Sequence, residues 1–155
     1  MPLTANQMQT LPDFFADIPD PRRSQGRRHC LSTILAIAAG ATLCGMRGYK
    51  AIFDWSKSLG PKALERFGCR CENGHRVVPS EYVIRNLLIR VEPEKLDHAL
   101  MRWNEVHGEE DEILAIDGKT MCNAIDGQGH QTHIMSAVGH RTKTCHTQKK
   151  LVCCR

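Results

Sequence analysis

The stretch Leu31–Leu43 limits the possible folds most, because it is apolar nearly all round when its residues are placed on a helix. Such a helix is stable in a soluble chain only where other segments cover it on every side. The stretch is too short to span a bilayer, and it contains Ser32 and Thr33. We therefore expect a buried helix here, capped by Ser32 or Thr33 and ended by the glycines that follow.

Apolar residues recur with a helical period on both sides of this segment, as far as Val106. Ser80 is a good N-cap, with Tyr82 on the apolar face of its helix, and Pro93 is tolerated in a first helical turn. The further predicted helices cover Leu11–Ala16, Tyr49–Leu59, a short segment around Ala63–Phe67, and two segments that begin at Ser80 and Pro93.

The last two helices, which together run to His107, are open to two interpretations. One is a DNA-binding helix-turn-helix that presents Arg85, Asn86 and Arg90 to a groove or to phosphates. The other is an ordinary helical hairpin in a small bundle. Composition favours the hairpin.

The chain has 8 cysteines, an even number that would suit disulfides in a secreted protein. No charged segment followed by an apolar one opens the sequence, so we expect a cytoplasmic protein with reduced thiols. Cys69 and Cys71 have the wrong spacing for a zinc site, and no second pair accompanies them. We expect the segment Gly68–Val78 to be an exposed loop.

A basic cluster precedes the buried helix and consists of Arg22, Arg23, Arg27 and Arg28. Arginine presents a fork of donors that suits phosphate oxygens, so the cluster is a candidate for contact with DNA. A solvated surface loop is the alternative. The net charge of +4 permits a polyanionic partner without requiring one.

The pattern changes after the acidic run Glu109–Glu112, where Ile113–Asp117 reads as a short buried strand that Gly118 ends. Asp117 would then lie at the mouth of a sheet, either as a metal-binding carboxylate or as part of an Asp-Gly turn. The remaining predicted segments are a turn region over Thr120–Gln131 around Asp126-Gly127, a second strand over Thr132–Val138 and a third over Thr142–Gln148.

Three stretches together resemble DDE-type insertion-sequence transposases of the H-repeat-associated (Rhs-element) group. They are Ile18-Pro19-Asp20-Pro21-Arg22-Arg23 with Gly26, His29-Cys30-Leu31 and Ile34-Leu35; Ala115-Ile116-Asp117-Gly118-Lys119-Thr120; and His133-Ile134-Met135-Ser136-Ala137. The resemblance implies an α+β fold, with a helical N-terminal domain over residues 1–108 and the first strands of an incomplete RNase H-like catalytic domain over residues 109–155.

The resemblance also implies roles for single residues. Asp117 matches the first catalytic carboxylate and would bind Mg²⁺, the usual ion of the family, and Lys119 could contact a phosphate. The implied partner is DNA at the ends of an insertion sequence, bound by the basic cluster and Lys119, and self-association or a full-length transposase is a further partner.

The sequence departs from the family in its carboxylates. Two metal ions need several carboxylates around them, and no later residue matches the second Asp or the Glu of the family. Residues 151–155 look like a short out-of-frame tail, so we expect a truncated N-terminal fragment without catalytic activity alone and with one sheet face and one edge exposed. The alternatives are a stand-alone DNA-binding or regulatory module that acts with a full-length transposase, and a decayed product without function.

Overall fold

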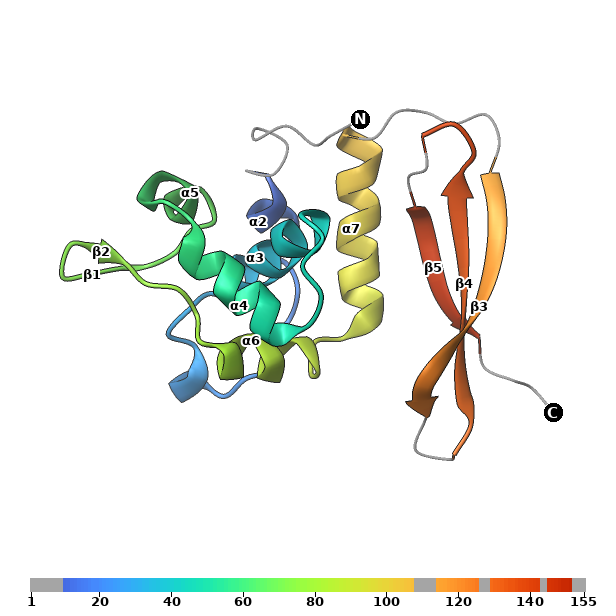
Figure 1. Cartoon of the computed structure of the whole chain (residues 1–155), viewed down its shortest axis with the longest axis horizontal. Helices are drawn as coiled ribbons and strands as arrows, with labels where there is room; N and C mark the ends of the chain where they lie inside the picture. Colours follow the sequence, from blue (N-terminus) through green and yellow to red (C-terminus); the bar gives the residue numbers. More distant parts are fainter. Residues whose placement is uncertain (1–9, 108–113, 126–128, 143–144, 152–155) are drawn as a thin grey trace. The chain divides into compact units, whose positions relative to one another are not determined.

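The computed structural model describes residues 10–107, 114–125, 129–142 and 145–151 (Figure 1). Its elements are α2 (Leu11–Phe14), the 3-10 turn η1 (Ser24–Gly26), α3 (Leu31–Leu43), α4 (Tyr49–Ser58), α5 (Pro61–Arg66), β1 (Cys71–Glu72), β2 (His75–Arg76), α6 (Glu81–Leu88), α7 (Pro93–His107), β3 (Leu114–Ile125), β4 (Gln131–Gly139) and β5 (Cys145–Leu151). This order of helices followed by antiparallel strands confirms the predicted α+β class.

The chain divides into two compact units, Pro2–Ala99 and Leu100–Arg155, and the division falls within α7. The predicted boundary between residues 108 and 109 lies outside the described residues. So do the acidic run, Ile113, the turn at Asp126-Gly127 and the tail over residues 152–155.

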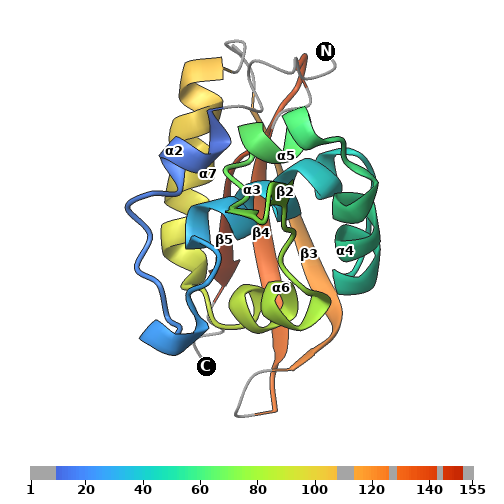
Figure 2. The ribbon, with the colours of Figure 1, turned by 90° about the vertical axis from the view of Figure 1, so that its left-hand side faces the viewer.

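Helix α3 forms the centre of the first unit, and α2, α4 and α6 pack against it (Figures 1 and 2). Nearly every side of α3 is covered, and Ile34, Leu35 and Ile37 are fully buried. The predicted bounds of this helix are confirmed. The predicted cap is wrong, because Cys30 occupies the N-cap position without a side-chain hydrogen bond. Thr33 Oγ1 donates instead to the carbonyl of Gly68 at 3.1 Å, which ties α3 to the segment after α5.

Gly40 allows two aromatic rings to approach the backbone of α3. A Cβ atom at this position would lie 3.0 Å from Phe67 Cζ and 3.2 Å from Trp55 Cη2. The two rings meet edge to face, with centroids 6.0 Å apart and an angle of 71° between their planes. The absence of a side chain at Gly40 therefore lets α4 and the segment after α5 close over the core.

The segment predicted as a loop contains a small antiparallel hairpin, in which β1 pairs with β2. Its two turn residues, Asn73 and Gly74, have φ angles of 51° and 79°, and Asn-Gly suits a two-residue turn of this kind. Cys69 is also buried rather than exposed, and burial raises the pKa of its thiol to about 11. The predicted exposure is thus confirmed from Cys71 to His75, whereas the hairpin and the burial of Cys69 were not predicted.

Helix α6 begins as predicted, because Ser80 Oγ accepts a hydrogen bond from the backbone N–H of Val83. Ile84 and Leu87 provide its buried face. Tyr82, which we placed on that face, is instead 71% exposed. None of the described helices has the length and apolar character that crossing a membrane requires.

The second unit contains a three-stranded antiparallel sheet in the order β3-β4-β5. Strand β3 does not end at Gly118, which pairs with Met135 inside the strand, and it continues to Ile125 through residues predicted to form a turn. The expectation of a buried strand is also wrong, because Leu114 and Ile116 are 51% and 73% exposed. In the same unit, Asn104 of α7 donates from Nδ2 to the carbonyl of Cys145 at 2.9 Å.

Candidate nucleic-acid interface

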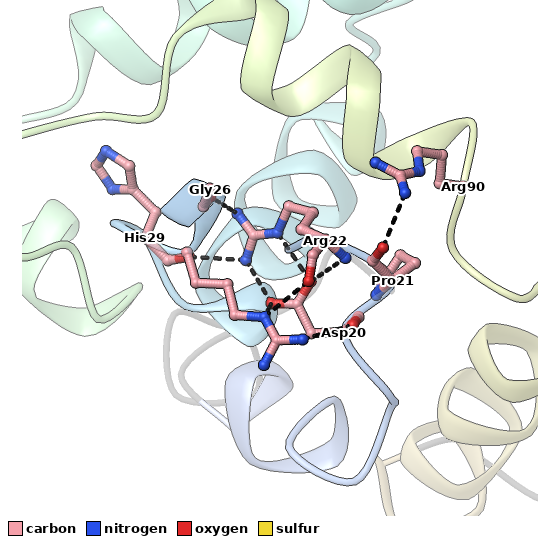
Figure 3. A network of polar contacts seen from close by, with 7 residues as sticks. Asp20, Pro21, Arg22, Gly26, His29 and Arg90 are labelled. Atoms are coloured by element: carbon pink, nitrogen blue, oxygen red, sulfur yellow. Dashed lines mark hydrogen bonds and ion pairs between the residues drawn. The ribbon is translucent and has the colours of Figure 1, made fainter. Parts of the chain in front are cut away.

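Arg22 is buried, with 5% of its surface exposed, although the basic cluster was predicted to contact DNA. Its Nε and Nη2 donate to Asp20 Oδ1 and Oδ2 at 2.9 and 2.7 Å (Figure 3). The same guanidinium donates to the carbonyls of Gly26 and His29 at 3.2 and 2.8 Å. With these bonds made, Arg22 holds the segment before α3 in shape and has no free face for a phosphate.

Arg27 supports the same segment from outside. Its Nε donates to the Arg22 carbonyl at 2.9 Å, and its Nη2 donates to the Asp20 carbonyl at 3.1 Å. The side chain is still 49% exposed. Arg90, which follows α6, adds a hydrogen bond of 2.9 Å to the carbonyl of Pro21 (Figure 3). The loop that carries the basic cluster is therefore fixed by side chains from two parts of the helical unit.

Arg23 and Arg28 differ from these two arginines. Both are exposed, and neither side chain has a hydrogen bond or ion pair with any part of the chain that the structure describes. Their charges stand on a backbone that Arg22 and Arg27 hold in place. They are consequently the members of the cluster that are available to a phosphate.

A surface cavity of about 360 Å³ lies beside this loop. Its lining includes Gln25, Arg28, His29, Arg70, Ser80 and Val83. These residues come from the loop before α3, the segment before β1, and the start of α6. The cavity thus brings together three parts of the helical unit that are distant in sequence.

His29 is 8% exposed, and its burial and the nearby charges shift the pKa of its imidazole. Burial is the largest influence that lowers the pKa of His29, since it disfavours the charged imidazolium. The positive charges that lower the pKa further are those of Arg70, Arg22 and Arg28, and the charge of Glu72 opposes them. The surroundings of the ring are therefore net positive.

The helix-turn-helix interpretation assigned Arg85, Asn86 and Arg90 to contacts with DNA. Arg85 lies over the ring of Tyr49, with 5.9 Å between Cζ and the ring centroid, and Arg90 is bonded to Pro21 as described above. Two of these three side chains therefore have partners inside the helical unit, which leaves the loop before α3 as the better candidate interface.

Asp117 lies within β3 rather than at a strand end, paired in register with Ser136 of β4. Its side chain is exposed, and Lys119 stands two residues further along the same strand. Further along the same two strands, Thr120 pairs with His133, and Thr120 Oγ1 is 2.9 Å from His133 Nδ1. The position of Asp117 is exposed within a paired strand and is not the strand end that the sequence suggested.

A divalent ion would find few ligands in this sheet. Asp117 is the only carboxylate in the described strands β3, β4 and β5. Across the described ranges as a whole, no group of three or more His, Cys, Asp or Glu side chains is placed to hold a metal ion. The donor set around Asp117 thus falls short of a site for two Mg²⁺ ions.

Comparison with known proteins gives several matches. A Xanthobacter autotrophicus protein from the dhlA 3′ region is 29% identical over 143 residues, which cover 89% of this chain and 47% of that protein. Two Escherichia coli K12 proteins named "H repeat-associated putative transposase", YhhI and YbfD, are each 27% identical over 135 residues. Those residues cover 84% of this chain, 34% of YhhI and 51% of YbfD.

The chain therefore spans only about a third to a half of the length of these relatives. No solved structure matches it. The protein family described as DDE_Tnp_1-associated matches residues 12–104, from α2 to within α7, which is more than half of the chain. The chain thus belongs to the DDE_Tnp_1-associated family and, with relatives of the H repeat-associated group, is a transposase-family protein.

Proposed function

We propose that this chain acts in DNA transposition and that its helical unit binds the DNA at insertion-sequence ends. The observation that carries the proposal is the pair Arg23 and Arg28, which are exposed and without partners among the described residues. A disordered basic tail would lose conformational freedom on binding, whereas this loop is already held by Arg22 and Arg27. Preorganised cations of this kind suit contact with the phosphate backbone.

The sheet of the second unit fits the start of an RNase H-like catalytic domain. Three antiparallel strands in sequential order support this reading, and Asp117 would be its first metal-binding carboxylate. When bound, Mg²⁺ would neutralise charge on a phosphate. With one carboxylate on the described strands, we expect the chain alone to leave DNA intact.

A second candidate function is a DNA-binding or regulatory module that acts with a full-length transposase. The family match ends within α7 and so coincides closely with the helical unit, which has its own core around α3. A unit of this kind can bind DNA without the sheet. Binding to the same DNA would then limit access of the complete enzyme.

Both candidates require DNA binding, and fluorescence anisotropy with a labelled duplex tests it directly. The logarithm of the binding constant should fall linearly with the logarithm of the salt concentration, by about 0.9 for each phosphate contacted. A duplex of random sequence should bind as well, since phosphate contacts carry no base information. Absence of binding to any duplex at low salt would contradict the proposal.

A further inference from the structure

The cavity beside the basic loop is positively charged and has no acid in its lining. Arg28 and Arg70 contribute cations, and none of the described residues that line the cavity is Asp or Glu. Arg70 Nη2 forms an ion pair with Glu72 Oε2 at 2.7 Å outside the lining, while Arg28 has no such partner among the described residues. The charge of the cavity is therefore only partly balanced within the helical unit.

Two buried nitrogen atoms, in residues that line the cavity, have no hydrogen-bond partner among the described residues. They are His29 Nδ1 and Arg70 Nε. His29 is more than nine-tenths buried and belongs to the lining, and its ring points away from the Arg22 network (Figure 3). Buried polar groups are nearly always paired in folded proteins, so two unpaired nitrogens in residues of one lining are an unusual feature.

The start of α6 adds a third favourable element. Ser80, the N-cap of this eight-residue helix, lines the cavity together with Val83 of the first turn. The N-terminus of a helix carries a partial positive charge, although Ser80 Oγ already accepts from the N–H of Val83 and Glu81 places a carboxylate in the first turn. An anion in the cavity would meet this end of the helix as well as the two arginines.

We propose that the cavity bounded by Arg28, His29, Arg70 and Ser80 binds one phosphate group, supplied by the DNA backbone. A phosphate offers several acceptor oxygens, and these match the guanidinium groups of Arg28 and Arg70 in the lining. A volume of about 360 Å³ accommodates a phosphate with part of its sugar. The assignment of the phosphate to DNA rests on the proposed function. The presence of a phosphate site in the cavity does not.

The first experiment tests the phosphate site without DNA. The full-length protein is titrated with inorganic phosphate, and the imidazole signals of assigned His29 are followed by NMR over a pH series. A bound phosphate is an opposite charge to the imidazolium, so phosphate should raise the pKa of His29. Chloride at the same ionic strength is the control and should leave that pKa unchanged. Equal pKa values in phosphate and chloride would overturn the site.

The second experiment tests DNA as the source, by anisotropy with a random duplex. Arg28→Ala should weaken binding about fivefold at about 0.15 M salt, the contribution expected from counterions released by one phosphate contact. Arg47→Ala is the matched control, because it removes an exposed arginine that lies outside the cavity lining. Equal affinities of the two variants would overturn DNA as the source. If wild-type protein bound no duplex at all, the proposed function would fail, and the phosphate titration would still decide the site.

Discussion

Arg22 and Asp20 form a two-pronged ion pair, with Nε–Oδ1 at 2.9 Å and Nη2–Oδ2 at 2.7 Å, in which only 4% of the arginine side chain is exposed. The pair closes the loop that leads into α3. Since Nη1 and Nη2 also donate to the carbonyls of Gly26 and His29, one side chain fixes both ends of the basic segment. DNA contact, in our account, belongs to the neighbouring arginines that this pair positions.

Replacement of Arg22 should destabilise the helical unit. Arg22→Ala leaves the Asp20 carboxylate without its main partner and removes the hydrogen bonds to the carbonyls of Gly26 and His29, so we expect a loss of about 3 kcal/mol. Urea unfolding followed by far-UV circular dichroism measures this change. Arg23→Ala, one residue away and exposed, is the control and should shift stability by less than about 0.5 kcal/mol. Equal stability of the two variants would refute a structural role for Arg22.

The same ion pair should make stability fall in acid. Burial acts to raise the pKa of Asp20, but the hydrogen bonds and charges of Arg22, with Arg27, outweigh it and hold the pKa below the ordinary value of 3.8. The unfolded chain therefore takes up a proton first as the pH falls. The stabilisation is complete above pH 3.8 and is lost as the pH falls through the lower pKa of the folded state.

Asp20→Asn should remove this part of the pH dependence. The variant is expected to be less stable than the wild type near neutral pH, with the difference shrinking in acid below the unfolded pKa. Denaturation curves of both proteins across the acid range measure the difference. A stability gap that stayed constant with pH would contradict the assignment.

Gly40→Ala tests the packing around α3. Alanine favours a helix over glycine by about 1 kcal/mol, but its Cβ would approach Phe67 and Trp55 within 3.2 Å. Because overpacking a core costs about 1–3 kcal/mol, we expect a net loss of stability. Gly26→Ala is the control, since its Cβ would lie 3.9 Å from Arg22 Cβ, an ordinary van der Waals contact. A stabilised Gly40→Ala variant would show that the aromatic pair does not pack as described.

The helical part of the fold was largely predictable from sequence. Leu31–Leu43 is so apolar that it is stable only as a helix covered by other segments on every side. Its predicted bounds agree with those of α3. Ser80 acts as the predicted cap because local chemistry decides an N-cap. The hairpin of β1 and β2 was missed although Asn73-Gly74, a strong hairpin signal, was present in the sequence.

Other features depend on contacts that a sequence pattern does not contain. Arginine in a polar loop usually faces solvent, and only the fold brings Arg22 to the carbonyl of His29, seven residues away. Gly118 permits a turn but does not require one, and pairing with Met135 keeps it inside β3. The cavity joins Arg28 to Arg70 and Ser80, a juxtaposition that arises from packing of α6 against α3.

Asp117 provides a test of catalysis. With one carboxylate on the described strands, Mg²⁺ or Mn²⁺ should bind weakly, and the chain alone should not nick supercoiled DNA. Gel analysis of plasmid incubated with the purified protein measures this. Metal-dependent nicking that disappeared in Asp117→Ala would contradict the prediction and mean that further acids complete the site.

The most direct test of the account is the salt dependence of duplex binding by a variant with Arg23→Ala and Arg28→Ala. Arg47→Ala with Arg66→Ala removes the same charge from exposed positions outside the basic loop and serves as the control. Loss of the loop arginines should lower the slope of log K against log salt by about 1.8, at unchanged stability, while the control keeps nearly the full slope. Equal slopes for the two double variants would contradict a DNA interface on the loop before α3.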